Sequence, residues 1–414
     1  MPQGSFDAET VWRSPALARA RRELRAHDGA VVATQIAVSE IAAPTGDERE
    51  RGEWIARRFH DVGLRDVRTD EAGNVIGRRA GAADLPAVVV CAHLDTVFPH
   101  GTALRVRRNG SRLEGPGIGD NGRGLAAMLA LARAIDGTAL RTRAPVDFVA
   151  TTGEEGAGDL RGAKQLFAGA ARDAGAAIAL DGAGDERVVH RALGSRRFRI
   201  AFRGVGGHSW TAWGMPNAVH AAAVCAAKLA RMSMPAQPRT TLTVGRIGGG
   251  IAVNAIPEEG WLEVDLRSTS ADVLDRYETE IRAAAAAAEQ EENDRRAHGT
   301  TPLGCAVARI GDRPGGETPA DHPLVALAAA ATRLAGREPE PATASTDANI
   351  PISLGIPAIA IGAGGRGGDA HTPAEWFDNT NGHAGLARAL AIVVGAAGLD
   401  GQGPGVGMQE AGRG

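Results

Sequence analysis

The stretch Ala87-Val88-Val89-Val90-Cys91-Ala92, followed directly by His93-Leu94-Asp95-Thr96-Val97, decides the fold. Its apolar run is unbroken, which is typical of a strand buried on both faces of a parallel sheet. Ligand sites of open α/β sheets lie beyond the carboxyl ends of such strands. The stretch therefore predicts a buried strand with His93 and Asp95 at the functional edge of its sheet.

Similar segments recur along the chain and extend this prediction to a whole sheet. Further strands are predicted at Val146–Thr151, Ala177–Leu180 and Pro357–Ile361. Between Ala87–Ala92 and Val146–Thr151, apolar residues from Leu125 to Ile135 recur at helical spacing, and Gly137 ends the pattern. Strands separated by helical segments predict an α/β fold, with a mostly parallel mixed sheet flanked by helices.

A different rhythm between about Ser195 and Ile310 predicts an inserted second domain. Its expected elements have the order βαββαβ, which is a ferredoxin-like unit. They are strands at Arg197–Val205, Thr240–Ile247, Trp261–Arg267 and Leu303–Ile310, and helices at Asn217–Met232 and Ala271–Asn293. We therefore expect a catalytic domain in two parts, 1–194 and 312–400, around an inserted domain at 195–311. Linkers are expected near 182–194 and 311–316, and a disordered Gly-rich tail at 401–414.

The composition limits the function. A chain of 414 residues is long enough for two domains. Its net charge of −3 gives no sign of the clustered basic face that binds nucleic acid. Cys91, Cys225 and Cys305 are widely spaced, which argues against a disulfide framework and favours a reducing compartment such as the cytoplasm. Neither a secretory signal nor a membrane span is predicted.

Acidic and imidazole side chains recur where predicted strands end or helices begin. Each has an ordinary interpretation by itself, such as a helix cap, an exposed acidic loop or a hydrogen-bonded structural histidine. Together, two histidines and three carboxylates form a mixed nitrogen and oxygen set that suits Zn²⁺, Mn²⁺ or Co²⁺. Five ligands are too many for one tetrahedral zinc, so the set predicts two ions that share a carboxylate. The candidate ligands are His93, Asp120, Glu155, Asp181 and His371.

These motifs, in their order and context, resemble the M20 family of dinuclear zinc peptidases and deacylases. That family includes peptidase T-like aminopeptidases, glutamate carboxypeptidases, aminoacylases and desuccinylases. The resemblance covers nearly the whole chain and departs at Asn121, where many members have a second Asp. The matching motifs are Ala43–Gly46, Ala72–Val75, His93–Val97, Gly115–Asp120, Gly153–Gly156, Leu180-Asp181, Gly206–Ser209 and His371.

The resemblance implies a role for each candidate residue. His93 and Asp181 would bind one ion, Glu155 and His371 the other, and Asp120 would bridge both and form a cis peptide bond with Asn121. Glu154 would be the general base that activates water, and Asp95 would orient His93. The inserted domain would serve as a lid or dimerisation domain. Its His208 would stabilise the tetrahedral intermediate, commonly in a partner subunit, and Asn254 and Arg267 would contact the substrate.

The resemblance implies a dimeric hydrolase of amide bonds in small peptides, and the spacing of the cysteines favours a cytoplasmic location. A peptidase T-like di/tripeptidase or aminopeptidase is the first interpretation, because Ser345–Ile350 and Gly362–Gly368 look most like that branch. A carboxypeptidase or an N-acyl-amino-acid deacylase on the same site is the alternative.

A distant alternative from another class is a dinucleotide-binding oxidoreductase. Gly117–Gly122 and Gly362–Gly367 both satisfy GxGxxG. The first lacks a strand directly before it, and the second lacks a helix after it, so both depart from the dinucleotide-binding context.

Overall fold

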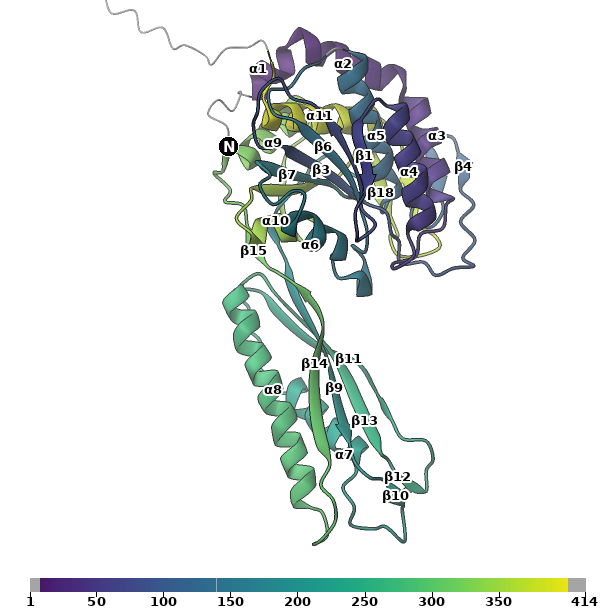
Figure 1. Cartoon of the computed structure of the whole chain (residues 1–414), viewed down its shortest axis with the longest axis vertical. Helices are drawn as coiled ribbons and strands as arrows, with labels where there is room; N and C mark the ends of the chain where they lie inside the picture. Colours follow the sequence, from purple (N-terminus) through teal and green to yellow (C-terminus); the bar gives the residue numbers. More distant parts are fainter. Residues whose placement is uncertain (1–7, 139, 401–414) are drawn as a thin grey trace, which may run out of the picture. The chain divides into compact units, whose positions relative to one another are not determined.

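The computed structural model describes residues 8–138 and 140–400 (Figure 1). The tail predicted at 401–414 lies outside these residues. The described chain forms two compact units. One ends at Arg191 and resumes at Glu317, and the other is Ala192–Gly316, slightly longer at each end than the predicted 195–311.

The first unit is built on a nine-stranded sheet with the order β1-β2-β6-β3-β7-β17-β8-β15, in which β16 pairs with β8. Its central strands are parallel and buried along their whole length, as the apolar runs predict. The sheet is mixed, because β2 and β8 pair antiparallel with their central neighbours. The predicted fold class is confirmed. The central strands are β6 (Val146–Thr151), β3 (Val88–His93), β7 (Ala176–Leu180) and β17 (Ala358–Ile361).

Helices cover both faces of this sheet (Figure 1). The helix α5 (Gly122–Gly137) packs on β3 and β7 together with α11 (Gly382–Ala397). The small helices α6 (Arg161–Ala168) and α10 (Asn349–Ser353) contact each other on the opposite face. Almost every side chain of α5 and α11 is buried, which fixes the start of α5 against the strand ends.

The remaining elements of the first unit lie around this core. Its other helices are α1 (Ala8–Arg13), α2 (Pro15–Ala26), α3 (Asp28–Ser39), α4 (Arg49–Asp61), the short η1 (Gly156–Gly158) and α9 (Pro323–Leu334). Its outer strands are β1 (Arg65–Thr69), β2 (Val75–Arg79), β8 (Arg187–Ala192), β15 (Gly316–Glu317) and β16 (Glu340–Ala344). A separate small sheet has the order β18-β19-β5-β4, with β4 (Arg107–Asn109), β5 (Arg112–Glu114), β18 (Arg366–Gly368) and β19 (Trp376–Asp378).

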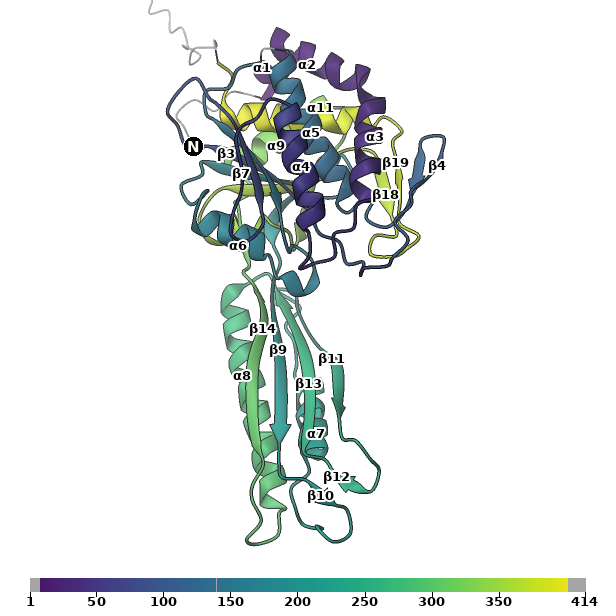
Figure 2. The same ribbon diagram turned by 45° about the vertical axis from the view of Figure 1, so that its right-hand side comes forward.

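The second unit has the predicted βαββαβ order. Its four main strands form an antiparallel sheet with the order β11-β13-β9-β14, which confirms the ferredoxin-like prediction. The helices α7 and α8 contact each other on one face of this sheet (Figure 2). The elements are β9 (Gly194–Arg203), β10 (Gly207–His208), α7 (Ala218–Ala230), β11 (Thr240–Gly249), β12 (Ala255–Ile256), β13 (Glu259–Ser268), α8 (Ala271–Asp294) and β14 (Gly304–Arg313).

One detail of the predicted organisation is wrong. The linker expected near 182–194 contains the strand β8, which pairs with β17 in the main sheet. Val188 and Val189 are buried there, so this segment belongs to the core of the first unit. None of the helices in the described residues is long and apolar enough to cross a membrane.

Candidate metal centre

Three adjacent parallel strands of the first unit end at the same edge of the sheet. His93 is the last residue of β3, Asp181 follows β7, and Glu154 and Glu155 follow β6 by a short turn. Because β3 lies between β6 and β7, these four side chains begin from neighbouring positions. His93, Glu154 and Glu155 are buried, with exposures of 2%, 5% and 7%.

Two loops bring the other candidate ligands to this edge. Asp120 lies on the loop before α5, and His371 lies on the loop between β18 and β19. The peptide bond from Asp120 to Asn121 is cis, as the resemblance implied. The Asn121 side chain accepts N–H bonds from Gly124 and Gly182 at 3.1 Å each and donates to the carbonyl of Leu180 at 2.9 Å. Asn121 thereby ties the start of α5 to the end of β7, beside Asp181.

Two of the three possible metal-ligand clusters among the described residues share the carboxylate of Asp120. In each cluster, the potential ligand atoms lie within 4.8 Å of one another. Asp120 Oδ1 lies 2.9 Å from His93 Nε2, and Asp120 Oδ2 lies 3.2 Å from His371 Nε2. His371 Nε2 also lies 2.7 Å from Glu155 Oε1. The two clusters that share Asp120 are His93–Asp120–Asp181 and Asp120–Glu155–His371.

The carboxylates of this site have pKa values shifted in opposite directions. Burial, reinforced by the negative charge of Asp120, raises the pKa of Asp181 to about 7. Burial also raises the pKa of Glu155. Asp120 differs, because its bonds to His371 and His93 outweigh burial and lower its pKa. Crowded carboxylates with pKa values pushed in opposite directions are typical of a site built for cations.

Asp95 is a buried carboxylate that contacts the residues carrying or flanking the candidate ligands. Its carboxylate accepts the N–H groups of Glu154 at 2.9 Å and Glu155 at 3.0 Å, and the hydroxyl of Thr45 at 2.8 Å. It lies 3.6 Å from His93 Nδ1, whose shorter contact of 3.0 Å is to the carbonyl oxygen of Asp95. These partners outweigh burial and lower the pKa of Asp95 to about 2. Asp95 therefore holds two parts of the site in place: the turn that carries Glu154 and Glu155, and the ring of His93.

Comparisons with known proteins agree with this geometry. The model of peptidase family M20/M25/M40 matches residues 89–396, which is more than half of the chain. The chain belongs to this peptidase family. The prediction made from the motifs is therefore confirmed, and the family is one of hydrolases that act on amide bonds.

Two individual relatives match only part of this M20 family member. An N-carbamoyl-L-amino acid amidohydrolase of Geobacillus stearothermophilus is 32% identical over 114 residues, 27% of this chain and 24% of that protein. A protein named as a probable carboxypeptidase of Aspergillus terreus is 25% identical over 256 residues, 55% of this chain and 58% of that protein. The chain thus spans less than two thirds of either relative.

Solved structures share the fold over a greater length. A tripeptidase from Staphylococcus aureus subsp. aureus Mu50 has a TM-score of 0.72 and 23% identity. The match covers 89% of this chain and 98% of that chain. At this identity the likeness shows a common fold.

The candidate residues of the second unit of this M20 member are less constrained. His208 is exposed on β10, and its Nδ1 accepts the N–H of Trp210 at 3.2 Å. In a neutral ring, Nε2 then carries the proton and can donate it. Asn254 is close by, because its carbonyl accepts the N–H of Ser209 at 3.0 Å.

Arg267 does not join His208 and Asn254. It lies near the end of β13, whose first residue, Glu259, follows shortly after Asn254. A strand rises about 3.3 Å per residue, so Arg267 is roughly 25 Å from that end of the sheet. Its Nε donates to Asp265 at 2.6 Å, so a partner already occupies the guanidinium.

Three further polar residues of this M20 member support the site without having been predicted. Asn121 and Glu48 accept backbone N–H bonds from the loops that carry the candidate ligands. Glu375 accepts three, from Gly117, Gly119 and Asp120. A pyrophosphate bound at Gly117–Gly122 would need these same N–H groups, so this GxGxxG segment is not available as a dinucleotide-binding loop.

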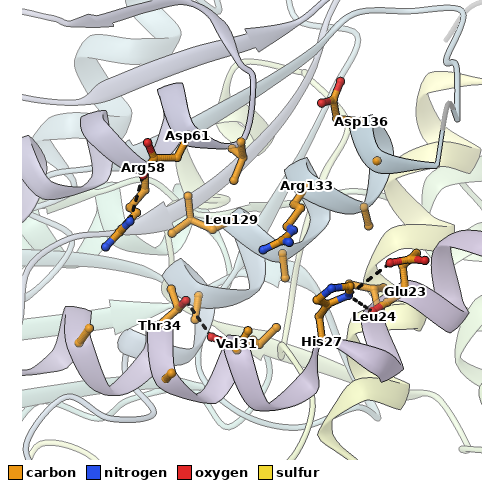
Figure 3. Close-up of a pocket in the computed structure, with 18 of the residues that line it drawn as sticks. Glu23, Leu24, His27, Val31, Thr34, Arg58, Asp61, Leu129, Arg133 and Asp136 are labelled. Atoms are coloured by element: carbon orange, nitrogen blue, oxygen red, sulfur yellow. Dashed lines mark hydrogen bonds and ion pairs between the residues drawn. The ribbon is translucent and has the colours of Figure 1, made fainter.

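A separate hollow lies between α3, α4 and α5, with a volume of about 700 Å³ (Figure 3). His27 contacts Glu23 at 3.3 Å, and Arg58 contacts Asp61 at 2.9 Å. None of the metal-ligand clusters in the part of the chain that the structure describes contains a residue that lines this hollow. The chemistry of this M20 member therefore concentrates at the strand ends.

Proposed function

We propose that the chain is a metal-dependent hydrolase of amide bonds in small peptides. One observation carries the proposal: the two oxygens of Asp120 face two different histidines, in two clusters that share only this carboxylate. A carboxylate with candidate ligands on both sides can bridge a pair of divalent ions.

The donor set fits two such ions. His93 and Asp181 would hold one ion, Glu155 and His371 the other, and Asp120 both. Mixed imidazole and carboxylate ligands suit Zn²⁺, with Co²⁺ or Mn²⁺ as alternatives. The raised pKa values of Asp181 and Glu155 support this assignment, because nearby cations would stabilise their charged forms. When bound, the ions would polarise the scissile carbonyl and make a water molecule more acidic.

Glu154 is the proposed general base. Its carboxylate clusters with His93 and Glu155, and its backbone is fixed through the N–H bond to Asp95. A buried carboxylate beside the reacting water would accept a proton from it and pass that proton to the leaving amine. His208, with Nε2 free to donate, would stabilise the developing oxyanion.

We propose a di- or tripeptide as the substrate. The motif resemblance of Ser345–Ile350 to the peptidase T-like branch supports this choice, as does the structural likeness to a tripeptidase. The local likeness to an N-carbamoyl-L-amino acid amidohydrolase favours a second candidate, an enzyme that removes a small acyl-type group from an amino acid. Both substrates contain an amide bond next to an amino-acid residue, so the same site could act on either.

A substrate panel with metal control tests the proposal. Purified protein is assayed on tripeptides, dipeptides, and N-acetyl and N-carbamoyl amino acids, before and after dialysis against a chelator. We expect tripeptide hydrolysis that disappears with the metal and returns when two equivalents of Zn²⁺ are added. Activity that survives metal removal would contradict the metal-dependent mechanism. A preference for N-carbamoyl amino acids would select the second candidate.

A further inference from the structure

Glu375 is a buried carboxylate that accepts three backbone N–H bonds from the loop before α5. Its Oε2 accepts the N–H of Gly117 at 2.7 Å, and its Oε1 accepts those of Gly119 and Asp120 at 2.8 Å each. The residue is 1% exposed. No ion pair with Lys or Arg is found for it within residues 8–138 and 140–400. Burial raises the pKa of Glu375 to about 6, and the three backbone N–H groups offset part of this effect, so the carboxylate is ionised at neutral pH.

These bonds matter because the loop before α5 has no regular structure of its own. Buried N–H groups must be paired, because an unpaired one has lost its bonds to water without gaining a new partner. An ionised acceptor forms shorter and stronger bonds to N–H groups than a neutral one does. The carboxylate of Glu375 thus holds the backbone of the loop at the residue that carries the shared ligand, Asp120.

Glu375 also belongs to the loop of another ligand, His371. The Glu375 N–H donates to the carbonyl of Thr372, which closes the turn that follows His371. The main chain of Glu375 accepts the N–H of Gly115 at 2.9 Å, and strand pairing of Trp376 with Glu114 continues this contact. A single residue therefore connects the backbone of Asp120 with the segment that carries His371, 251 positions apart in the sequence.

We propose that Glu375 is a positioning residue that sets Asp120 against His371 and thereby determines the affinity of the ion bound by Asp120, Glu155 and His371. This inference rests on the proposed two-metal function. The other cluster depends less on Glu375, because His93 and Asp181 lie at the ends of buried strands. Loss of the Glu375 carboxylate should therefore affect the two ions unequally.

The test uses Glu375→Gln, which keeps the volume but leaves one oxygen for three donors. Zn²⁺ is titrated calorimetrically into the metal-free full-length protein, and Co²⁺ absorption spectra report the coordination of each ion. We expect one of the two binding steps to lose about 10–100-fold in affinity and the other to change less, as is usual when a residue that orients a metal ligand is removed. Glu375→Asp, which keeps the charge, should recover part of this loss.

Glu292→Gln is the matched control in the second unit. Glu292 is also a buried carboxylate that accepts a backbone N–H, from Asn217 at 2.8 Å, but it lies in none of the metal-ligand clusters. It should bind both ions as the wild type does. If Glu375→Gln is less stable to heat than the wild type but binds both ions with wild-type affinity, the positioning role is wrong.

A second variant disturbs the same contact from the other side and leaves Glu375 in place. A Cβ at Gly119 would lie 3.1 Å from Glu375 Oε1, so Gly119→Ala must push the carboxylate by a few tenths of an ångström. If Glu375→Gln does not fold, weakened Zn²⁺ binding by Gly119→Ala supports the inference, and unchanged binding overturns it. A wild type that does not bind two ions would overturn the proposed function itself.

Discussion

The metal centre in the first unit and the His208 region in the second differ in how completely the fold prepares them. Around the metal centre, buried strands, a helix start and buried carboxylates fix each candidate side chain. In the second unit, His208 and Asn254 are exposed, as are the apolar neighbours Trp210 and Val253, with exposures of 85% and 104%. The proposed metal ligands thus lie at the buried core of the first unit, whereas the proposed oxyanion donor, His208, lies on the exposed short strand β10.

This difference indicates which contributions each region can make. Residues held at strand ends keep their geometry without a substrate and can bind cations beforehand. Exposed side chains such as that of His208 have few fixed contacts, and they gain further contacts only when a substrate or another protein surface covers them. We therefore expect substitutions in the first unit to affect metal content or the chemical step, and substitutions in the second to affect catalysis without metal loss.

The largest effect is expected from Glu154→Gln. This change removes the proposed base but keeps the backbone N–H that donates to Asp95. Loss of general base catalysis should lower kcat by about 10²–10⁴-fold. Metal content, measured by mass spectrometry of the purified protein, should stay at two ions per chain. If Glu154→Gln retains wild-type kcat, the base is another residue.

The sequence was informative where local pattern determines structure. The strand Val146–Thr151 is predicted with the bounds that β6 has, because four of its six buried residues are apolar and only Asp147 and Thr151 interrupt the pattern. The three-residue strands β5 and β19 were not predicted, since they are too short to show alternation. Glu375 could not be inferred either, because its N–H donors lie more than 250 positions away and leave no local pattern.

The next effect concerns His208→Ala. Removal of one oxyanion donor should lower kcat by about 10²–10³-fold, with both ions retained. If the protein is a symmetric dimer in which His208 acts in the partner's site, mixing His208→Ala with Glu154→Gln should restore activity. Random reassociation would give about a quarter of the wild-type rate, because half of the dimers have one complete site. No recovery after verified subunit exchange would show that His208 acts within its own chain.

A smaller effect is expected on the stability of the metal-free protein. The folded pKa of Asp181 is raised to about 7, so the folded state holds a proton that the unfolded state releases near pH 3.9. The stability that this proton gives is present at low pH and is lost as pH rises from about 4 to about 7. The hydrogen bond to Asp120 raises the pKa of His371 to about 9, so the stability that His371 contributes is lost between about pH 6.5 and 9.

Thermal unfolding of the metal-free protein should therefore occur at lower temperature as pH rises, and Zn²⁺ should reverse this at pH 8. Asp181→Asn should flatten only the lower part of the curve; an unchanged slope between pH 4 and 7 would rule out Asp181 as its source.

The smallest effect is expected from Arg267→Gln. The resemblance assigns Arg267 to the substrate carboxylate, but its guanidinium is paired with Asp265 and lies far along β13 from Asn254. An ion pair that is partly exposed is worth only about 0–1 kcal/mol, so a substrate carboxylate could displace Asp265 at little cost. The free energy that the substrate gains from binding Arg267 in place of Asp265 is equally small. We therefore expect KM for a tripeptide to rise by less than about tenfold with kcat unchanged, which corresponds to less than about 1.4 kcal/mol of binding.

A C-terminally amidated tripeptide is the control, because it has no carboxylate and should give the same KM with both proteins. If KM rises equally for both substrates, Arg267 acts through the structure of β13 rather than by recognising a carboxylate. A loss of several hundredfold with the free acid alone would instead make the second unit as decisive for substrate binding as the first is for metal binding.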